Sequence, residues 1–337
     1  MINKNTIIEK AVIPAICLLL GLFAGYYLYA MRVGGDVNKG FYEKREGGYQ
    51  LINPLLECEG GSNLFRNKEL RPFKKKVEGY LRERMRYPGV ETASVYFREL
   101  NDGIWFSIGE TERFTPASLR KVPMMIAVLK QEERDPNLLA RKVRFQLRSD
   151  HTLQQIIKPS SVMTRETEYT VEELLRRMIV YSDNNAYMVL SANVDLQEFN
   201  RTYEALNIPS PDAVGPSDFL SIQTYASFFR VLYNATYLNK VRSEQALALL
   251  TQIDFKSGIV AGLPKDLPVA HKFGEHRDDD TGKIQLHDCG IVYYPQHPYL
   301  LCIMTRGSSL EYLDDAISAI SRIIYLEVNT QYNVLHD

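Results

Sequence analysis

Residues 114–125 read FTPASLRKVPMM, and the organisation of the chain can be worked out from this stretch. A turn-forming Thr-Pro pair precedes Ser118, and the apolar run over residues 122–129 follows it. This order predicts a buried helix that carries Ser118 in its first turn. Residues three apart share one face of a helix, so Lys121 should lie beside the Ser118 hydroxyl. A desolvated lysine is able to take the proton of a serine, and the free N–H groups of a helix start are able to stabilise an oxyanion.

A serine and a lysine at this spacing also occur by chance, as a helix with an N-terminal serine and a solvated lysine. Two later segments favour the catalytic interpretation. Residues 182–184 read SDN, directly after a predicted helix, and residues 272–274 read KFG, at the end of a predicted strand. Taken singly, the first is also typical of a helix stop with a capped turn, and the second of a strand end.

The order S-x-x-K, S-D-N, K-x-G is the signature of class A β-lactamases and penicillin-binding proteins. The chain resembles this family from about Lys68 to about Val328, and it is most similar to the class A branch. The resemblance implies a serine hydrolase with an acyl-enzyme mechanism, in which Ser118 is acylated, Lys121 is the base and Ser182 relays a proton to the leaving nitrogen.

The resemblance also implies the substrate-binding residues, which are Asn184, Lys272, Gly274 and Glu275. Asn184 would hydrogen-bond the substrate amide, and Lys272 would attract a substrate carboxylate. The backbone N–H groups of Ser118 and Glu275 would form the oxyanion hole. Asp183 is expected to be buried and structural. Two lysines near one serine should lower each other's pKa, which suits a neutral amine base.

Periodicity predicts an α+β fold, and the resemblance implies the same architecture, that of a β-lactamase-like domain. Strands at both ends of the domain bracket a helical middle, so they should form one five-stranded antiparallel sheet, flanked by the first and last helices. The middle forms a mostly helical lobe, with Ser118 in the cleft between lobe and sheet. Helices are predicted over residues 68–85, 170–180, 185–194, 195–206, 221–234, 243–253 and 310–326, the second opened by a capping box at Thr170–Glu173. Strands are predicted over residues 92–100, 104–108, 269–273, 289–294 and 299–305.

Two departures from the family matter for turnover. Phe273 stands where the family usually has Thr or Ser, which removes a hydroxyl that binds the substrate carboxylate. A hydrogen bond to a charged group contributes roughly 1.5–3 kcal/mol, or about ten- to a hundred-fold in affinity. The segment over residues 207–220 contains no glutamate, whereas class A enzymes use one there to activate the deacylating water. Asp212 and Asp218 are the acidic residues available to replace it. We therefore expect slow deacylation, and a substrate end that is less anionic or more apolar than penicillin.

Ala11–Met31 contains no charged residue, and its 21 residues suffice to cross a bilayer as a helix. A cleavable signal peptide is the closest alternative, but the Leu-Tyr-Ala before Met31 is a poor cleavage site. We expect a cytoplasmic tail over residues 1–10, a transmembrane signal anchor over 11–31, a tether over 32–67 and the hydrolase domain over 68–337. The resemblance places that domain outside the cytoplasm, as part of a single-pass protein of the cell membrane.

Composition limits the other functions. The chain has 337 residues and a net charge of −1, which does not favour a nucleic-acid partner. Four scattered cysteines do not indicate a disulfide scaffold. Cys289 and Cys302 flank a predicted hairpin turn, and we expect two small buried hydrophobic side chains rather than a bonded pair. The sequence predicts no cofactor and no metal, since His276, His287, Asp288 and Cys289 match no standard zinc spacing.

Two further hypotheses belong to other classes. In the first, an inactive relative keeps the fold to bind cell-wall fragments or a protein partner, as Phe273 and the missing glutamate would allow. In the second, the chain is a membrane scaffold, which explains the anchor but not the three motifs. The favoured hypothesis is a monomeric hydrolase of a β-lactam or a peptidoglycan peptide.

Overall fold

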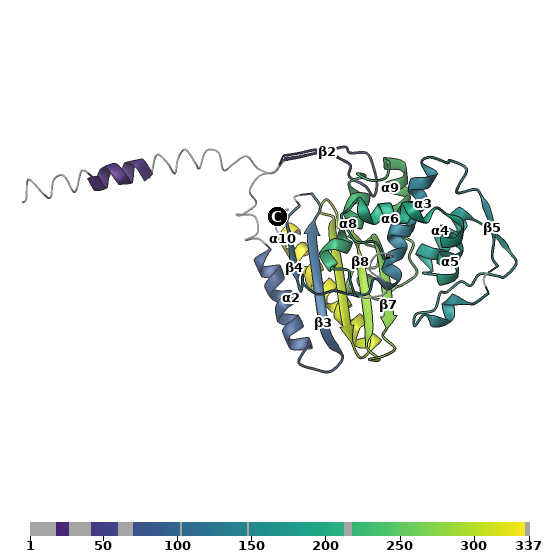
Figure 1. The fold of residues 1–337 in the computed structure, drawn as a ribbon. Coiled ribbons are helices and arrows are strands. Elements are labelled where there is room, and N and C mark those ends of the chain that lie inside the picture. The colour runs from purple at the N-terminus through teal and green to yellow at the C-terminus, as the bar shows by residue number, and fades with distance from the viewer. Residues whose placement is uncertain are drawn as a thin grey trace, which may run out of the picture. The chain divides into compact units, whose positions relative to one another are not determined.

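The computed structural model describes residues 18–26, 42–59, 70–101, 103–146, 148–211 and 218–333. Its contacts divide the chain into two units, Met1–Lys44 with Leu56–Phe65, and Arg45–Leu55 with Arg66–Asp337. In the first unit, residues 18–26 are helical and exposed, and the other residues of the predicted anchor lie outside the described part (Figure 1). Among the described helices, none is both long enough and apolar enough to cross a bilayer.

A five-stranded antiparallel sheet forms the centre of the second unit, as predicted. The strands are β3 (Val90–Glu99), β4 (Trp105–Ile108), β7 (Val269–Arg277), β8 (Ile284–Val292) and β9 (Tyr299–Gly307), in the order β4-β3-β9-β8-β7. Strands from both ends of the domain therefore pair directly, with Val95 of β3 opposite Ile303 of β9. The sheet leaves β7 as an edge strand, and this edge faces the helical lobe (Figure 1).

The terminal helices cover one face of the sheet. They are α2 (Arg71–Arg84) and α10 (Leu310–Asn333), which pack on each other, while α10 also packs on β8 and β9. The apolar residues of α2 recur at helical spacing, and Phe73, Val77 and Leu81 are buried. They share one hydrophobic cluster with Val95, Phe97 and Leu301 of the sheet and with Leu313 and Ile317 of α10.

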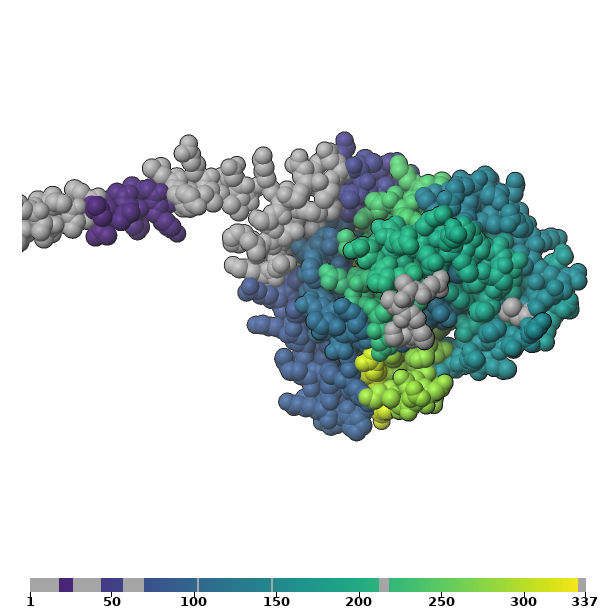
Figure 2. Space-filling view, viewed as in Figure 1, coloured from purple at the N-terminus to yellow at the C-terminus, as the bar shows by residue number. Residues whose placement is uncertain are grey.

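The lobe consists of short helices between β4 and β7. They are α3 (Lys121–Glu132), α4 (Val171–Val180), α5 (Asn184–Asn193), α6 (Leu196–Glu204), α8 (Ile222–Tyr233) and α9 (Lys240–Leu250). A two-stranded ladder, β5 (Lys142–Arg144) with β6 (Glu168–Thr170), lies at its outer side. The predicted capping box is confirmed, since the Thr170 hydroxyl accepts a hydrogen bond from the Glu173 backbone N–H at 3.1 Å. In the surface view, the teal lobe residues lie above the yellow-green C-terminal strands (Figure 2).

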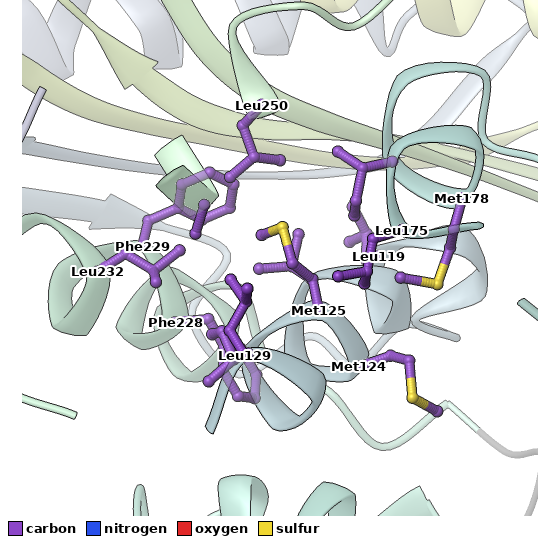
Figure 3. Packing of buried hydrophobic residues seen from close by; sticks show 14 of the residues in the cluster. Leu119, Met124, Met125, Leu129, Leu175, Met178, Phe228, Phe229, Leu232 and Leu250 are labelled. Atoms are coloured by element: carbon purple, nitrogen blue, oxygen red, sulfur yellow. The ribbon is translucent and has the colours of Figure 1, made fainter. Parts of the chain in front are cut away.

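Helix α3 is the buried helix of the lobe, which fixes the position of the segment that precedes it. Every residue from Lys121 to Leu129 is buried. Figure 3 shows the side chains of α3 enclosed by those of α4, α8 and α9. The labelled residues are Leu119, Met124, Met125, Leu129, Leu175, Met178, Phe228, Phe229, Leu232 and Leu250. A close-packed interior of this kind resists displacement, so the residues at the start of α3 are held firmly.

Three of the boundaries that differ from the sequence prediction lie near the predicted site. Ser118 lies in a 3-10 turn, η2 (Ala117–Arg120), directly before α3 rather than in its first α-helical turn. Strand β7 continues through Glu275 to Arg277, and β8 begins at Ile284, so both are longer than predicted. The predicted strands are too short because polar and charged residues occupy the hairpin end, and the apolar pattern that indicates a strand does not extend to them.

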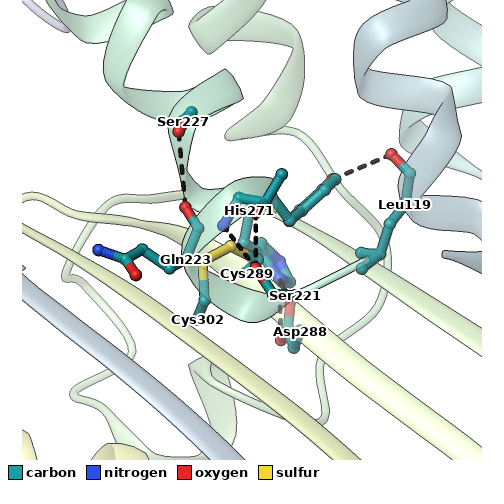
Figure 4. The surroundings of a disulfide bond; sticks show 10 residues. Leu119, Ser221, Gln223, Ser227, His271, Asp288, Cys289 and Cys302 are labelled. Carbon is teal, nitrogen blue, oxygen red and sulfur yellow. Dashed lines mark hydrogen bonds and ion pairs between the residues drawn. A yellow bond between two sulfur atoms is a disulfide. The ribbon is translucent and has the colours of Figure 1, made fainter. Parts of the chain in front are cut away.

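The prediction of an unbonded cysteine pair is wrong. Cys289 and Cys302 are directly opposite on β8 and β9 and form a disulfide, both fully buried (Figure 4). The predicted proximity across the hairpin is confirmed. Four scattered cysteines argue against a disulfide scaffold. A single cross-strand disulfide, however, needs only two cysteines that lie opposite each other on neighbouring strands.

Replacing both Cys289 and Cys302 by alanine should lower the free energy of unfolding by roughly 2–4 kcal/mol, because the disulfide closes a loop across a sequence separation of 13 residues. Urea unfolding of wild type and double variant, each without reductant, measures the difference. Wild type treated with a thiol reductant under unfolding conditions is the matched control and should behave like the variant. Equal stability of oxidised wild type and variant would contradict the prediction.

Residues 45–55 belong to the second unit, where hydrogen bonds hold them. The Glu244 carboxylate accepts hydrogen bonds from the backbone N–H groups of Gln50, Leu51 and Ile52, at 3.2, 3.0 and 3.0 Å. The Tyr293 hydroxyl donates to the Leu51 carbonyl oxygen at 2.9 Å. The predicted tether over residues 32–67 thus includes a docked stretch between β1 (Tyr42–Arg45) and β2 (Leu55–Glu59).

Candidate active site

The turn η2 brings Ser118 and Lys121 to one side of the backbone, because side chains three apart eclipse in a 3-10 helix. Leu119 anchors the turn from within, being fully buried, and its carbonyl oxygen accepts a hydrogen bond from the Tyr225 hydroxyl at 3.0 Å. Ala117 has a φ of 48°, a left-handed conformation that costs a non-glycine residue about 1 kcal/mol or more. Packing of Leu119 and α3 therefore holds a strained residue next to the candidate nucleophile.

Lys121 is buried, and within the described part of the chain its side-chain hydrogen bonds go to the SDN segment. Its Nζ donates to the Ser182 carbonyl oxygen at 2.6 Å, to Ser182 Oγ at 3.2 Å and to Asn184 Oδ1 at 2.7 Å. The Ser118 hydroxyl, which is half-buried, has no hydrogen bond among the described residues. Catalytic hydrogen bonds are often long in unliganded proteins and shorten when substrate binds.

Lys272 approaches Ser182 from the opposite side. It lies on β7 and is fully buried, and its Nζ donates to Ser182 Oγ at 2.9 Å and to the Phe273 carbonyl oxygen at 2.9 Å. The same Nζ lies 4.0 Å from the centroid of the Phe273 ring, a cation–π contact. One hydroxyl therefore bridges two lysine side chains from distant parts of the chain.

Burial lowers the pKa of both lysines. The pKa of Lys121 falls well below its ordinary value, first because of burial and then because of the charge of Lys272. Burial also lowers the pKa of Lys272 to about 7, although the charges of Asp288 and Glu275 act in the other direction. A lysine with a depressed pKa loses its proton more readily than a solvated lysine, and the neutral amine is able to accept a proton.

The SDN segment begins helix α5, and Asp183 is its N-cap. The carboxylate of Asp183 is buried and accepts hydrogen bonds from the backbone N–H groups of Asn185 at 2.7 Å and Ala186 at 3.3 Å. Ser182 has a φ of 55°, again left-handed. The cap and the strained residue together turn the Ser182 hydroxyl toward both lysines, which agrees with the structural role expected for Asp183.

Gly274 allows β7 to approach the nucleophile turn closely. A Cβ atom at position 274 would lie 3.0 Å from the Leu119 backbone nitrogen and 3.2 Å from the Pro116 carbonyl oxygen. These distances are shorter than most contacts of real Cβ atoms, so glycine favours this close approach. Because Glu275 is the next residue on the edge strand, its backbone lies beside the same turn, as an oxyanion hole shared with Ser118 requires.

A cavity of about 490 Å³ opens beside these residues. Ser118, Lys121, Asn184 and Glu275 line it, and Ser182, Lys272 and Gly274 do not. The predicted site residues thus form two layers, one at the cavity wall and one behind it. The remaining lining residues are Ala117, Arg120, His151, Gln154, Gln155, Ile156, Tyr187, Met188, His276, Arg277 and Asp279.

Sequence reasoning missed Gln155, which belongs to the same network. Its Nε2 donates to the Ser182 carbonyl oxygen at 3.0 Å, and its Oε1 accepts from the Asn184 backbone N–H at 3.2 Å. Asn184 Nδ2 also donates to the His151 carbonyl oxygen at 3.3 Å. The sequence around Gln155 contains no motif and no periodicity that would distinguish it.

The structure places the residues that depart from the family pattern away from the cavity. Phe273 is 4% exposed and its ring stacks on that of Phe255, with centroids 4.2 Å apart, so it offers no apolar wall to a substrate. Asp218 pairs with Arg306 and accepts a hydrogen bond from Gln285 Nε2 at 2.9 Å, and it does not line the cavity. Asp212 lies outside the described residues.

Of the four residues that match no standard zinc spacing, His287, Asp288 and Cys289 have other partners. His287 Nε2 lies 3.1 Å from the Thr115 carbonyl oxygen, and His271 Nδ1 lies 2.9 Å from Asp288 Oδ1. Over the described ranges, no group of three or more potential ligands gathers that would hold a metal ion.

Comparison with known proteins supports the same assignment. The chain matches the Beta-lactamase enzyme family over residues 72–328. Among solved structures it is similar to PBP-A, at 20% identity and a TM-score of 0.63, over 77% of this chain and 97% of that chain.

A β-lactamase from Xanthomonas campestris pv. campestris is similar at 20% identity and a TM-score of 0.63, over 76% of this chain and 98% of that one. A class A β-lactamase from Mycobacterium abscessus is similar at 19% identity and a TM-score of 0.60, over 75% of this chain and 99% of that one. No curated protein sequence matches this chain. The structural likenesses show the shared fold, and with the family match over most of the domain they give one answer: the chain belongs to the β-lactamase enzyme family.

Proposed function

We propose that this protein is a membrane-anchored serine hydrolase that cleaves an amide bond, in a β-lactam or a peptidoglycan peptide, through an acyl-Ser118 intermediate. The observation that carries the proposal is the Ser182 hydroxyl, which lies 3.2 Å from Lys121 Nζ and 2.9 Å from Lys272 Nζ. The contact with Lys121 links the candidate base to Ser182, the candidate donor of a proton to the leaving nitrogen. A variant of PBP-A similar to this chain is described as an acyl-enzyme complex with penicillin G, which favours the same chemistry.

In the proposed acylation, neutral Lys121 takes the proton of the Ser118 hydroxyl, and Ser118 Oγ forms a bond to the carbonyl carbon. The backbone N–H groups of Ser118 and Glu275 stabilise the oxyanion. When the carbon–nitrogen bond breaks, Ser182 gives its proton to the leaving nitrogen and receives one from the Lys121 ammonium. Lys272 keeps the Ser182 hydroxyl in position throughout. Each group returns to its starting protonation state except Ser118, which is now an ester.

Hydrolysis of that ester should be slow. The loop over residues 207–220 has no glutamate to activate a water molecule, and Asp218 is held in an ion pair with Arg306. The acyl-enzyme would therefore accumulate, as in a penicillin-binding protein.

The location outside the cytoplasm is part of the proposal. The uncharged Ala11–Met31 suits a bilayer-spanning anchor, with residues 1–10 in the cytoplasm. A buried disulfide between Cys289 and Cys302 is typical of an oxidising compartment. The domain over residues 68–337 would then face the cell wall as a monomer.

Intact mass spectrometry tests the proposed reaction. The protein is incubated with benzylpenicillin or with a fluorophosphonate, and the adduct is followed over time. We expect a Ser118 adduct that forms in the wild type, is absent in Ser118→Ala, and decays over minutes to hours for the penicillin. Absence of any adduct with both reagents, or an equal adduct on Ser118→Ala, would instead favour the inactive binding module.

A further inference from the structure

The Glu275 side chain lines the cavity beside the candidate nucleophile. It is half-buried, and Oε1 accepts a hydrogen bond from the Ile156 backbone N–H at 2.9 Å. The backbone N–H of Ile157 also stabilises the carboxylate. Burial raises the pKa of Glu275, while the two N–H donors and the charges of Lys121 and Lys272 act in the other direction. The structure therefore holds this carboxyl group in a fixed position at the wall of the cavity.

The cations next to this carboxylate are not available to an incoming anion. Lys272 is fully buried, and its ammonium is covered by Ser182 Oγ, by the Phe273 carbonyl oxygen and by the Phe273 ring. Lys121 is 2% exposed and donates to three oxygen atoms of residues 182–184. Both charges act on Glu275 through space, yet neither forms an ion pair with it among the described residues.

Other charged residues line the outer part of the cavity. Arg277 and Asp279 are exposed, as is Arg120, whose guanidinium lies over the Tyr187 ring with Cζ 5.1 Å from the centroid. Because exposed charges are screened by water and salt, the half-buried Glu275 acts most strongly on a group bound beside Ser118. A group bound beside Ser118 therefore lies mainly in the electric field of the Glu275 carboxylate.

We propose that the carboxylate of Glu275 determines substrate specificity, by selecting amides or esters whose group beside the scissile carbonyl is neutral or cationic and disfavouring those with a carboxylate there. This inference rests on the proposed acylation of Ser118. It differs from the effect of Phe273, which removes an attractive contact, since Glu275 adds a repulsive one. Penicillins, as anions, are then poor acyl donors for this site.

Benzylpenicillin and its neutral methyl ester provide the test, because they differ only in the charge of one carboxyl group. The rate of Ser118 acylation is measured by intact mass for each compound, and the ratio of acid to ester is compared between variants. Glu275→Gln removes the charge but keeps an oxygen that accepts the Ile156 N–H. We expect the acid-to-ester ratio to rise about ten-fold or more, as one unit charge nearby predicts.

Asp279→Asn is the matched control, since it removes an exposed negative charge from the same cavity, and its ratio should change by less than about three-fold. Glu275→Ala removes both the charge and the hydrogen bond from the Ile156 N–H. If the charge alone sets the acid-to-ester ratio, this variant should raise the ratio as much as Glu275→Gln does. A rise in the alanine variant alone, or an unchanged ratio in the glutamine variant, overturns the inference.

A neutral fluorophosphonate distinguishes this failure from failure of the proposed function. If it labels Ser118 of the wild type while the ratio does not move, the hydrolase proposal stands and the role of Glu275 is wrong. If it labels no variant at Ser118, the proposed acylation is wrong, and the inference about Glu275 falls with it.

Discussion

Replacing Lys121 by methionine should reduce the rate of Ser118 acylation by about 10²–10⁴-fold, the usual contribution of a general base. Methionine has a similar length and suits a buried site, so the packing of α3 should survive. The lost amine leaves Ser182 Oγ bonded to Lys272 alone. The acylation rate with a fluorophosphonate measures the effect.

Lys130→Met is a matched control on the same helix, because Lys130 donates to Glu133 and to the Tyr237 carbonyl oxygen, away from the cavity. It should acylate at the wild-type rate. The pH dependence adds a second readout. Since burial and the charge of Lys272 lower the pKa of Lys121, the wild-type rate should rise with pH and level off well below the ordinary lysine pKa. Equal rates for Lys121→Met and Lys130→Met would exclude Lys121 as the base.

Replacing Lys272 by methionine should slow acylation and, at neutral pH, raise the free energy of unfolding by a few kcal/mol. Burial lowers the pKa of Lys272 to about 7 in the folded protein. Between that pH and the ordinary lysine value, the unfolded chain keeps a proton that the folded chain has released. Wild-type stability must therefore rise with pH in this window, and the penalty is fully present below pH about 7.

Urea unfolding at several pH values between about 6 and 10 measures both effects. The stability difference between Lys272→Met and wild type should be largest at the acid end and should shrink as pH rises. Lys130→Met, the same change at a lysine that pairs with Glu133 outside the site, is the matched control. A difference that is constant with pH would mean that Lys272 is not destabilised by burial.

The strands of the sheet and the positions of the motifs follow from the sequence because they depend on local patterns. The capping box at Thr170, for example, is fixed by residues close together in the chain. The SxxK, SDN and KFG segments were predicted to meet, and the structure brings Lys121, Ser182 and Lys272 within hydrogen-bonding distance. A known order of motifs carried the long-range part of that prediction.

What sequence did not predict depends on contacts between distant segments. Gln155 lies in a stretch without periodicity, yet its amide holds both Ser182 and Asn184. The disulfide requires the register of β8 against β9, which places Cys289 opposite Cys302. The K-x-G motif gives a role only to the backbone N–H of Glu275. The direction of its side chain depends on residues 155–157, where the Ile156 N–H donates to the carboxylate.

The central claim is that the turn at Ser118 and the edge strand β7 together form one acylation site. A crystal structure of the acyl-enzyme, trapped with a slowly hydrolysed acyl donor, tests this most directly. The account predicts an ester on Ser118 Oγ whose carbonyl oxygen lies about 2.7–3.1 Å from the backbone nitrogens of both Ser118 and Glu275. An acyl group on another residue, or a carbonyl oxygen directed away from β7, would contradict it.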